Sequence, residues 1–332
     1  AQIEELVMTL KTFITLISIS LTTLFSQSSN SRPVSTYSIV AYDEETGQLG
    51  VAVQSHWFAV GQLVPWAKAG VGAVVTQSFV RVEYGPDGLT LMEEGVSAED
   101  ALAQLLADDP QQAVRQVAMI DVKGSVAAHT GERCIDMAGH QVGKNFSVQA
   151  NLMEKKSVWP AMAEAFENSN GNLADRMLAA LESAEAEGGD IRGRQSATML
   201  IVSGKPTGID WQDIVLDLRV DDSPEPLVEL RRLLRIHRAY EHANQGDYFM
   251  EENLINEALE EYRLAAEFYP ENVELPYWSA VALAGIGRTE EALPIFYSVF
   301  STNPNLRTMT PRLVKAGLLP DDPKLLDMII KQ

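Results

Sequence analysis

Residues 36–55 read TYSIVAYDEETGQLGVAVQS and contain two apolar runs separated by a polar turn. The first run, TYSIVAY, alternates in the manner of a strand with one face in a core. The second run, LGVAVQS, is apolar over most of its length, which is typical of a buried strand. Gly47 lies in the DEETGQ turn, where a residue without a β-carbon is favoured. The stretch therefore predicts a β-hairpin at the start of the folded chain.

The same strand-rich pattern continues to about residue 222, and its helices are grouped rather than evenly interleaved with strands. Ser97 precedes an acidic first turn and is expected to cap a helix. Residues 115–131 are expected to form a second hairpin about Lys123-Gly124. Further strands are expected at 70–78, 145–151, 188–204 and 211–222. Helices are expected at 84–95, 97–109, 158–169 and 172–188. This order predicts an α+β domain over residues 36–222, with two packed sheets and helices outside them.

Residues 223–332 are expected to form a separate all-helical domain, because two prolines and several acidic residues mark the boundary before a helical tail. Residues 239–272 and 273–306 superimpose at a period of about 34 residues, which is the tetratricopeptide spacing. The aligned pairs include Gly246 with Ala280 and Tyr262 with Phe296. Small residues where helices cross and aromatic residues beside them suit two antiparallel helices. The tail thus resembles two tetratricopeptide repeats, followed by short capping helices.

Residues 1–35 are interpreted as a leader and a propeptide-like segment. Within them, Lys11, an apolar stretch over 13–25 and the small residues Ser26 and Ser28 have the anatomy of a secretory signal. The apolar stretch is shorter than the about 20 residues that span a bilayer, and a buried helix is the alternative interpretation. The sequence therefore predicts a secreted or periplasmic protein without a stable membrane span.

The formal net charge of −20 disfavours nucleic acid as a partner, because phosphate binding needs clustered Lys and Arg. Cys134 is the single cysteine, so no disulfide can form within the chain. Cys134 lies between His129 and His140 and could be a thiol nucleophile or, with Asp136, a metal ligand. The spacing matches no common zinc pattern, and a small buried side chain is the preferred interpretation. No metal or cofactor is expected.

The first domain resembles one bacterial and archaeal family, the domain of unknown function 1028, which is placed in the N-terminal-nucleophile (Ntn) hydrolase superfamily. The segments that carry the resemblance are TYSIVAYDEETGQLGVAVQS, VPWAKAGVGAVVTQS, YGPDGLTLM, TGERC, Asn151 at its strand end and GGDIRGRQSA. The resemblance implies a four-layer αββα sandwich whose first strand begins with a nucleophilic Thr, Ser or Cys. It also implies action on an amide bond, although the activity of the family itself is unassigned.

Under this resemblance Thr36 is the candidate nucleophile. Its own α-amine would be the base, because at pH 7 about one terminal amine in seven is neutral, against about one unperturbed lysine in 2,500. That base exists only after the bond between Ser35 and Thr36 is cut. Signal cleavage at Ser26 or Ser28 would leave a segment such as SNSRPVS before Thr36, so a second cut, autocatalytic or by another protease, is required. The alternative is that Thr36 is an ordinary strand residue in a fold that has lost catalysis.

Further candidate residues lie where the predicted strands end. Asn151 is a candidate oxyanion donor, or else a turn-forming residue. Arg194 is a candidate for orienting the nucleophile or a substrate carboxylate, with Asp190 beside it; a salt bridge from Asp190 that fastens the loop is the alternative. The candidate substrate-binding residues are Asp190 and, at two strand ends, Gln54, Ser55, Gln77 and Ser78. Each of the four strand-end residues is, taken alone, more often a satisfied strand terminus.

Two functions from different classes follow. The first is a secreted amidohydrolase of the Ntn type that cleaves a small or peptide-like amide, with the repeats for protein interaction or self-association. The second is a non-catalytic secreted binding or assembly protein on the same scaffold.

Overall fold

The computed structural model describes residues 33–332. The predicted signal peptide lies outside these residues. Contacts divide the chain into two compact units at Asp217 and Leu218. The chain is thus a mixed α/β protein with a C-terminal helical region, and each unit is described separately below.

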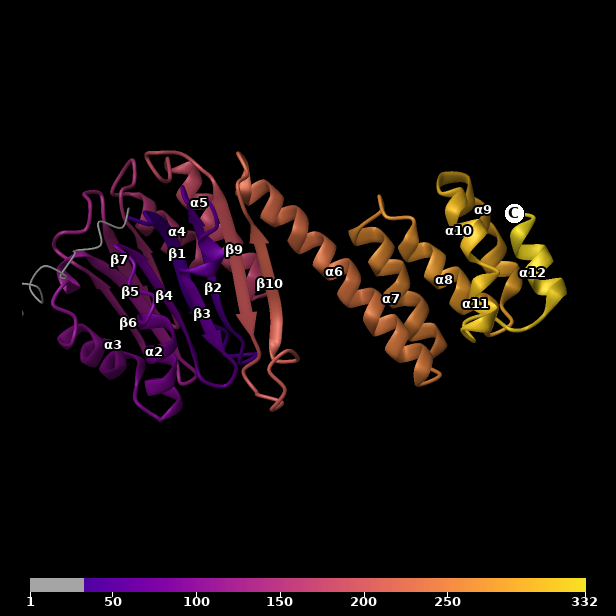
Figure 1. Cartoon of the computed structure of the whole chain (residues 1–332), viewed down its shortest axis with the longest axis horizontal. Helices are drawn as coiled ribbons and strands as arrows, with labels where there is room; N and C mark the ends of the chain where they lie inside the picture. The colour runs from indigo at the N-terminus through magenta and orange to yellow at the C-terminus, as the bar shows by residue number, and fades with distance from the viewer. Residues whose placement is uncertain (1–32) are drawn as a thin grey trace, which may run out of the picture. The chain divides into compact units, whose positions relative to one another are not determined.

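The larger sheet of the first unit has six strands, and the predicted hairpin lies at its centre (Figure 1). In sheet order the strands are β10 (Ile214–Val220), β9 (Ser196–Val202), β2 (Leu49–Ser55), β1 (Thr36–Tyr42), β8 (Phe146–Ala150) and β7 (Gly139–Gly143). The hairpin register runs from Thr36 opposite Ser55 to Tyr42 opposite Leu49. Gly47 has a φ of 74°, and the Asp43 carboxylate accepts hydrogen bonds from the turn backbone. The predicted hairpin is therefore present, and Asp43 shapes its turn.

The smaller sheet has four antiparallel strands in chain order. They are β3 (Pro65–Lys68), β4 (Gly72–Ser78), β5 (Arg115–Asp121) and β6 (Val126–Thr130). Strands β5 and β6 form the hairpin expected about Lys123-Gly124, where Gly124 has a φ of 80°. Strand β7 was not expected, because its sequence GHQVG has neither an apolar run nor clear alternation.

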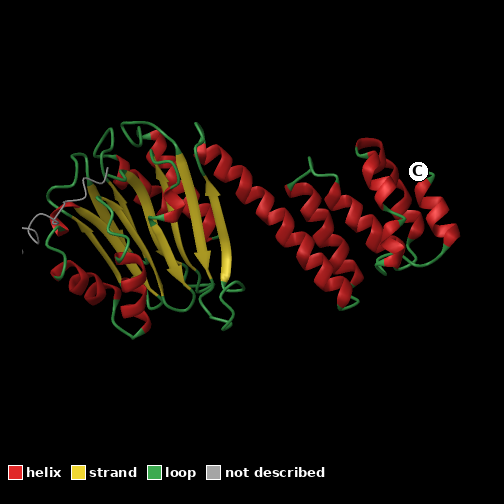
Figure 2. Ribbon diagram, in the orientation of Figure 1, coloured by secondary structure: helices red, strands yellow, loops and turns green. Residues whose placement is uncertain are grey.

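Helices cover the outer faces of both sheets, as Figure 2 shows for the strand layers in yellow and the helices in red. Helices α2 (Tyr84–Glu93) and α3 (Ala98–Ala107) pack on the four-stranded sheet, and α4 (Val158–Asn168) and α5 (Leu173–Ala186) pack on the six-stranded sheet. Two short 3-10 helices, η1 (Val60–Gln62) and η2 (Gln112–Val114), complete this unit. The Ser97 hydroxyl caps α3, as predicted, by accepting from the Asp100 amide at 3.1 Å.

The space between the two sheets changes character along the strands. Most of its length is an apolar cluster that includes Val40, Val51, Val75 and Ile120. Towards the first residue of β1, the buried inward-facing side chains become uncharged polar groups. A buried polar group costs free energy unless it is hydrogen-bonded, so this end of the sandwich needs either a built network or a function.

The C-terminal unit consists of α6 (Pro226–Glu251), α7 (Ile255–Phe268), α8 (Glu274–Gly285), α9 (Thr289–Thr302), α10 (Pro304–Met309), α11 (Arg312–Lys315) and α12 (Pro323–Ile330). Helix α6 packs along α7, and α8 packs along α9. Both small residues of the aligned pairs, Gly246 and Ala280, are buried, as are the aromatic residues Tyr262 and Phe296. The helix α6 begins 13 residues before the first predicted repeat, which starts at Ala239.

The turn between α6 and α7 and the turn between α8 and α9 have the same left-handed backbone conformation at equivalent positions, although the residues there differ. Asn253 has a φ of 59° and Gly287, 34 residues later, has a φ of 83°. Asparagine tolerates the left-handed region better than most residues with a β-carbon, so it can occupy the position that glycine fills in the second pair. Over residues 33–332, no helix is both long enough and apolar enough to cross a membrane.

Candidate active site around Thr36

Thr36 is the first residue of β1 and is fully buried between two polar neighbours. Ser55, the last residue of β2, lies directly opposite it, and its Oγ is 3.1 Å from Thr36 Oγ1. On the other side, the backbone amide of Asn151 donates to the Thr36 carbonyl at 3.1 Å. Thr36 Oγ1 also lies 2.8 Å from the Val34 carbonyl oxygen, to which it can donate. The structure thus brings Thr36, Ser55 and Asn151 together across three neighbouring strands.

The carbonyl of Ser35 belongs to the peptide bond that would have to be cut, and it accepts two hydrogen bonds. Ser55 Oγ donates to it at 2.6 Å, and Arg192 Nη2 donates at 3.1 Å. Both hydrogen bonds would stabilise negative charge on this oxygen, and the Arg192 guanidinium adds a full positive charge of its own. Donors of this kind are what an oxyanion at the same carbonyl would need.

Arg192 is held in place by Asp190, whose side chain is fully buried. Nε and Nη2 of Arg192 donate to the two carboxylate oxygens at 3.0 Å and 2.7 Å. The salt bridge anticipated from the sequence is therefore present, and it presents the guanidinium to the Ser35 carbonyl. The loop GGDIRGRQSA contains both Arg192 and Arg194, and the sequence pattern favoured Arg194 for the functional role.

Arg194 lies on the other face of the six-stranded sheet. Its Nε donates to Glu185 Oε1 at 2.5 Å, and the Tyr37 hydroxyl donates to Glu185 Oε2 at 2.6 Å. Burial and the neighbouring Glu185 carboxylate raise the pKa of Tyr37 well above its ordinary value, so the phenol stays protonated. Gln54 pairs with Tyr37 in the β1–β2 register and shares its face. These residues therefore pack towards the helices, away from Thr36 Oγ1.

Of the Gln77-Ser78 pair at the end of β4, Gln77 faces the opposite sheet. Gln77 Nε2 lies 3.3 Å from the Thr36 carbonyl oxygen and 2.7 Å from Gln116 Oε1. Ser78 points to the other face, because successive strand residues alternate. Its backbone, with a φ of 67°, forms a two-bond bridge with Val34. The four Gln and Ser candidates thus divide: Ser55 and Gln77 lie at Thr36 through their side chains, and Ser78 lies near through its backbone.

Gln116, at the second position of β5, is a residue that sequence analysis did not select. Its Oε1 accepts from Gln77 and, at 2.9 Å, from Asn151 Nδ2. Its Nε2 donates to the Ala150 carbonyl and to Thr130 Oγ1, both at 2.9 Å. The available signal was a polar residue at the edge of the apolar run VAMI, similar to the signal that had selected Gln54 and Gln77.

Two buried polar atoms next to Thr36 have no hydrogen-bond partner. They are Asn151 Oδ1 and Ser35 Oγ. Both polar atoms of the Gln54 side chain are unpartnered as well, on the helix-facing side. Unpartnered buried polar groups are costly, and their concentration at one strand end marks a place that is built for something other than stability.

The segment around Cys134 forms a surface pocket of about 430 Å³, which is also lined by Asp136, His140 and Lys156. Cys134 Sγ donates to the Arg115 carbonyl at 3.2 Å, and burial raises the pKa of the thiol. A thiol with a raised pKa is a poor nucleophile at neutral pH. Burial, and then the charge of His129, lower the pKa of His140. Within residues 33–332, no three His, Cys, Asp or Glu side chains gather in a metal-binding arrangement.

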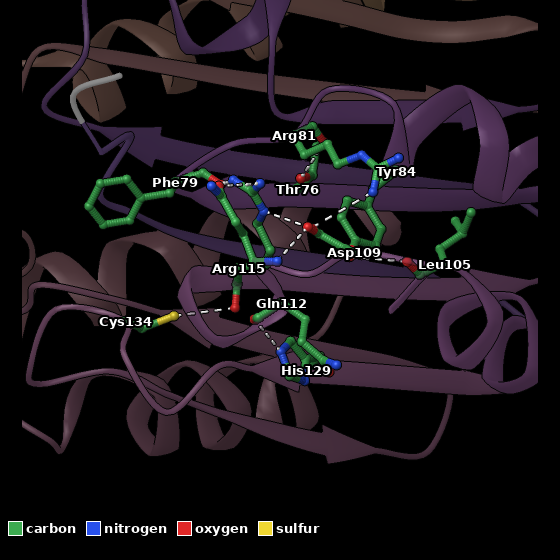
Figure 3. Close-up of polar contacts among 11 residues, drawn as sticks. Thr76, Phe79, Arg81, Tyr84, Leu105, Asp109, Gln112, Arg115, His129 and Cys134 are labelled. Carbon is green, nitrogen blue, oxygen red and sulfur yellow. Dashed lines mark hydrogen bonds and ion pairs between the residues drawn. The ribbon is translucent and has the colours of Figure 1, made fainter. Parts of the chain in front are cut away.

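Arg115 also anchors the chain that follows β4, as Figure 3 shows. Its Nε donates to the buried Asp109 carboxylate at 2.8 Å, and its Nη1 donates to the Phe79 carbonyl at 2.5 Å. Tyr84 donates to the same carboxylate at 3.1 Å. Because Phe79 follows Ser78, this ion pair fixes the strand end that bridges to Val34.

A family model and a solved structure relate this chain to the same family. The family model described as "Family of unknown function (DUF1028)" matches residues 36–230, which is more than half of the chain. The crystal structure of protein SPO2555 from Silicibacter pomeroyi, assigned to the same family, matches at 31% identity with a TM-score of 0.54. The match covers 60% of this chain and 85% of that one.

A second solved structure, Anbu (ancestral beta-subunit) from Yersinia bercovieri, matches at 14% identity with a TM-score of 0.31, over 59% of this chain and 92% of that one. No functionally curated protein matches significantly. The extent of the family match and the identity to protein SPO2555 establish the relationship: this chain belongs to the DUF1028 family.

Proposed function

We propose that the chain is the precursor of an N-terminal-nucleophile amidohydrolase, in which Thr36 becomes both the nucleophile and the first residue. The observation that carries this proposal is the pair of donors, Ser55 Oγ and Arg192 Nη2, on the carbonyl oxygen of Ser35. A chain segment that only leads into a strand does not require a charged donor at one of its carbonyls. Here the Ser35 carbonyl has such a donor, Arg192, which the buried carboxylate of Asp190 holds in place. The order of layers, helices on both outer faces of two packed sheets, supports an αββα scaffold of the Ntn type.

The position of Thr36 supports the same proposal. The family match begins at this residue, so the sequence shared with the family starts at the proposed nucleophile. Thr36 Oγ1 has only hydroxyl and carbonyl neighbours, Ser55 Oγ and the Val34 oxygen. No side-chain base is bonded to it in this arrangement, and its own freed amine would supply one.

Catalysis would proceed through an ester on Thr36. The neutral α-amine takes the hydroxyl proton as Oγ1 adds to the substrate carbonyl carbon, and the oxyanion accepts hydrogen bonds from Ser55 and Arg192. The carbon–nitrogen bond then breaks, and the proton passes from the α-ammonium to the leaving amine. Water hydrolyses the ester, with the same amine as base, and releases a carboxylic acid.

Asn151 takes a different part from the oxyanion donor expected from its sequence position. Its Nδ2 is committed to Gln116, and its unpartnered group is the acceptor Oδ1. We assign Oδ1 to accept a hydrogen bond from the freed amine or from a substrate N–H, and Gln116 and Gln77 to hold Asn151 and the Thr36 backbone in position. Gln54, Asp190 and Arg194 would then act on the shape of the site and not on the reacting atoms.

The helical unit would serve protein interaction or self-association as a tetratricopeptide-like module. The burial of the aligned Gly246, Ala280, Tyr262 and Phe296, together with the matched turns at Asn253 and Gly287, supports this proposal. The same proposal includes a location outside the cytoplasm, because residues 1–35 are interpreted as a leader and a propeptide-like segment.

Labelling and turnover test the hydrolase. The secreted protein is treated with an amine-and-hydroxyl-directed electrophile such as a β-lactone, and it is assayed on a library of acyl amides. Wild type and Thr36→Ser are expected to be labelled on residue 36 and to hydrolyse some amides, and Thr36→Ala is expected to do neither. Equal hydrolysis by Thr36→Ala would contradict the assignment and leave the non-catalytic binding protein as the better account.

A further inference from the structure

The two residues before Thr36 are built into the fold. Val34 is 3% exposed and Ser35 is fully buried. The Val34 amide donates to the Ser78 carbonyl at 2.7 Å, and the Ser78 amide donates back to the Val34 carbonyl at 3.0 Å. The Val34 side chain belongs to the apolar cluster between the sheets, with Val53, Val60 and Val75. This short segment therefore lies as an extended strand against the end of β4.

These residues are the acyl half of the bond that the proposed function requires to be cut. Their departure would leave three features without partners: the backbone N–H and carbonyl of Ser78, the apolar place of Val34, and the two donors on the Ser35 carbonyl. Ser78 has a φ of 67°, a strained conformation for a residue with a β-carbon. A new ligand that restores all three sets of contacts would have the same shape as the segment that left.

We propose that the substrate is a peptide or peptide-like amide whose acyl half is extended and replaces Val34 and Ser35. The inference rests on the proposed function and gives it a substrate class. Two-bond pairing with Ser78 would hold the substrate backbone, in the manner of a peptide added to a sheet edge. A branched apolar residue would occupy the place of Val34, and a small residue would occupy that of Ser35.

The environment of Ser35 determines which substrate side chain can precede the amide bond that is cut. Its side chain has no exposed surface, so a larger residue would clash unless the site opened. Its Oγ has no hydrogen-bond partner, so the site does not recognise the hydroxyl. Alanine is therefore expected to be accepted at least as well as serine, because it buries no unsatisfied polar atom.

The inference also predicts product inhibition. Hydrolysis turns the acyl half into a carboxylate at the position of the Ser35 carbonyl, beside Arg192. A carboxylate there would form a charge-assisted hydrogen bond with the guanidinium, which the neutral carbonyl of a substrate forms more weakly.

The test uses the processed protein that begins at Thr36 and a series of aminomethylcoumarin amides. Acetyl-Pro-Val-Ala and acetyl-Pro-Val-Ser amides are expected to be the best substrates. Replacing Val by Gly, or the last residue by Phe, should lower kcat/KM by about 10- to 200-fold, the range typical of a poor fit in an apolar pocket. Replacing Val by Lys should abolish turnover.

Binding provides a readout that is independent of turnover. Acetyl-Pro-Val-Ala with a free carboxylate should bind the processed protein in calorimetry and inhibit it competitively. Its C-terminal amide should bind about tenfold more weakly, and Arg192→Gln should remove the difference between acid and amide. The uncut chain, whose site is already occupied by Val34 and Ser35, is the matched control and should not bind either peptide.

The outcomes separate this inference from the function on which it rests. If the protein begins at Thr36 and hydrolyses other acyl amides through Thr36, yet shows no preference in the peptide series and does not bind the acid, the substrate class is wrong and the hydrolase stands. If the secreted protein never begins at Thr36, the hydrolase is contradicted and the substrate class falls with it.

Discussion

The hydroxyl of Ser55 donates a hydrogen bond of 2.6 Å to the carbonyl oxygen of Ser35, the residue before the proposed nucleophile. Ser55 is the last residue of β2 and is opposite Thr36 in the hairpin register, so the relationship is fixed by the first hairpin of the chain. The same hydroxyl lies 3.1 Å from Thr36 Oγ1. One side chain thus contacts both the proposed nucleophilic oxygen and the oxygen of the carbonyl group that it would attack.

Removing either donor to the Ser35 carbonyl should slow both cleavage before Thr36, if it is autocatalytic, and amide hydrolysis afterwards. Ser55→Ala and Arg192→Gln are each expected to lower the rate by about 100-fold, the typical loss for one oxyanion donor. Intact and N-terminal mass over time, followed by kcat on an acyl amide, measure the two steps.

Arg194→Gln is the matched comparison for Arg192→Gln. It removes a guanidinium two residues away, which is bonded to Glu185 on the helix-facing side. Its effect on both rates should be much smaller. A loss from Arg194→Gln equal to that from Arg192→Gln would show that the loop as a whole matters, and not the donor to Ser35.

The buried ion pair between Asp109 and Arg115 should support stability in a pH-dependent way. Burial alone would raise the pKa of Asp109, but hydrogen bonds from Arg115 and Gln111 outweigh it and hold the pKa below its ordinary value. The contribution is therefore complete above the unfolded pKa of about 4 and is lost as the pH falls through the lower folded pKa. Asp109→Asn leaves Arg115 without its buried partner and should cost about 3–5 kcal/mol at pH 7.

Urea unfolding of wild type and Asp109→Asn between pH 3 and pH 7 checks this prediction. The difference in the free energy of unfolding should narrow towards pH 3. A difference that stays constant over this range would mean that the variant acts through packing and not through the charge of Asp109.

In the helical unit, two glycines should respond to alanine in opposite ways. A β-carbon at Gly246 would lie 2.6 Å from the ring of Tyr262, which is also held by a hydrogen bond of 2.7 Å from its hydroxyl to Asp247. Gly246→Ala should therefore destabilise the unit by about 1–3 kcal/mol, as overpacking does. At Gly285 the nearest atom is 3.7 Å away, and Gly285→Ala should stabilise by up to about 1 kcal/mol.

Thermal and urea unfolding followed by circular dichroism at 222 nm measure both changes. The sign is the informative quantity, since both variants add the same methyl group to a helix. No destabilisation by Gly246→Ala would contradict the close crossing of α6 and α7 at Gly246, and destabilisation by Gly285→Ala would contradict the open space around Gly285.

The local fold was predictable because it depends on patterns of apolar, polar and turn-forming residues over short stretches of sequence. The first hairpin, the hairpin about Gly124, the Ser97 cap and the helix pairs all depend on residues close in sequence. Strand β7 was missed because GHQVG has no periodic signal, and its pairing with β8 depends on tertiary contact. The longer start of α6 was missed because the repeat alignment locates similarity and not helix ends.

The candidate site was predictable in part for the same reason. Ser55, Gln77 and Asn151 were selected as polar residues at strand ends, and those ends meet at Thr36, which the family resemblance had indicated. The choice between Arg192 and Arg194 could not be made from sequence, because it depends on which way a glycine-rich loop turns. Gln116 was missed because its role comes from the opposing sheet, whose position over β1 and β8 no local pattern specifies.

The mass of the N-terminal peptide of the purified, secreted protein shows whether the bond between Ser35 and Thr36 has been cut. The protein is expected to begin at Thr36 with a free amine, and Thr36→Ala is expected to lose reactivity towards the electrophile. A secreted protein that still begins at or before Ser35 would contradict the proposed mechanism, because the Thr36 nitrogen would remain an amide and could not act as the base.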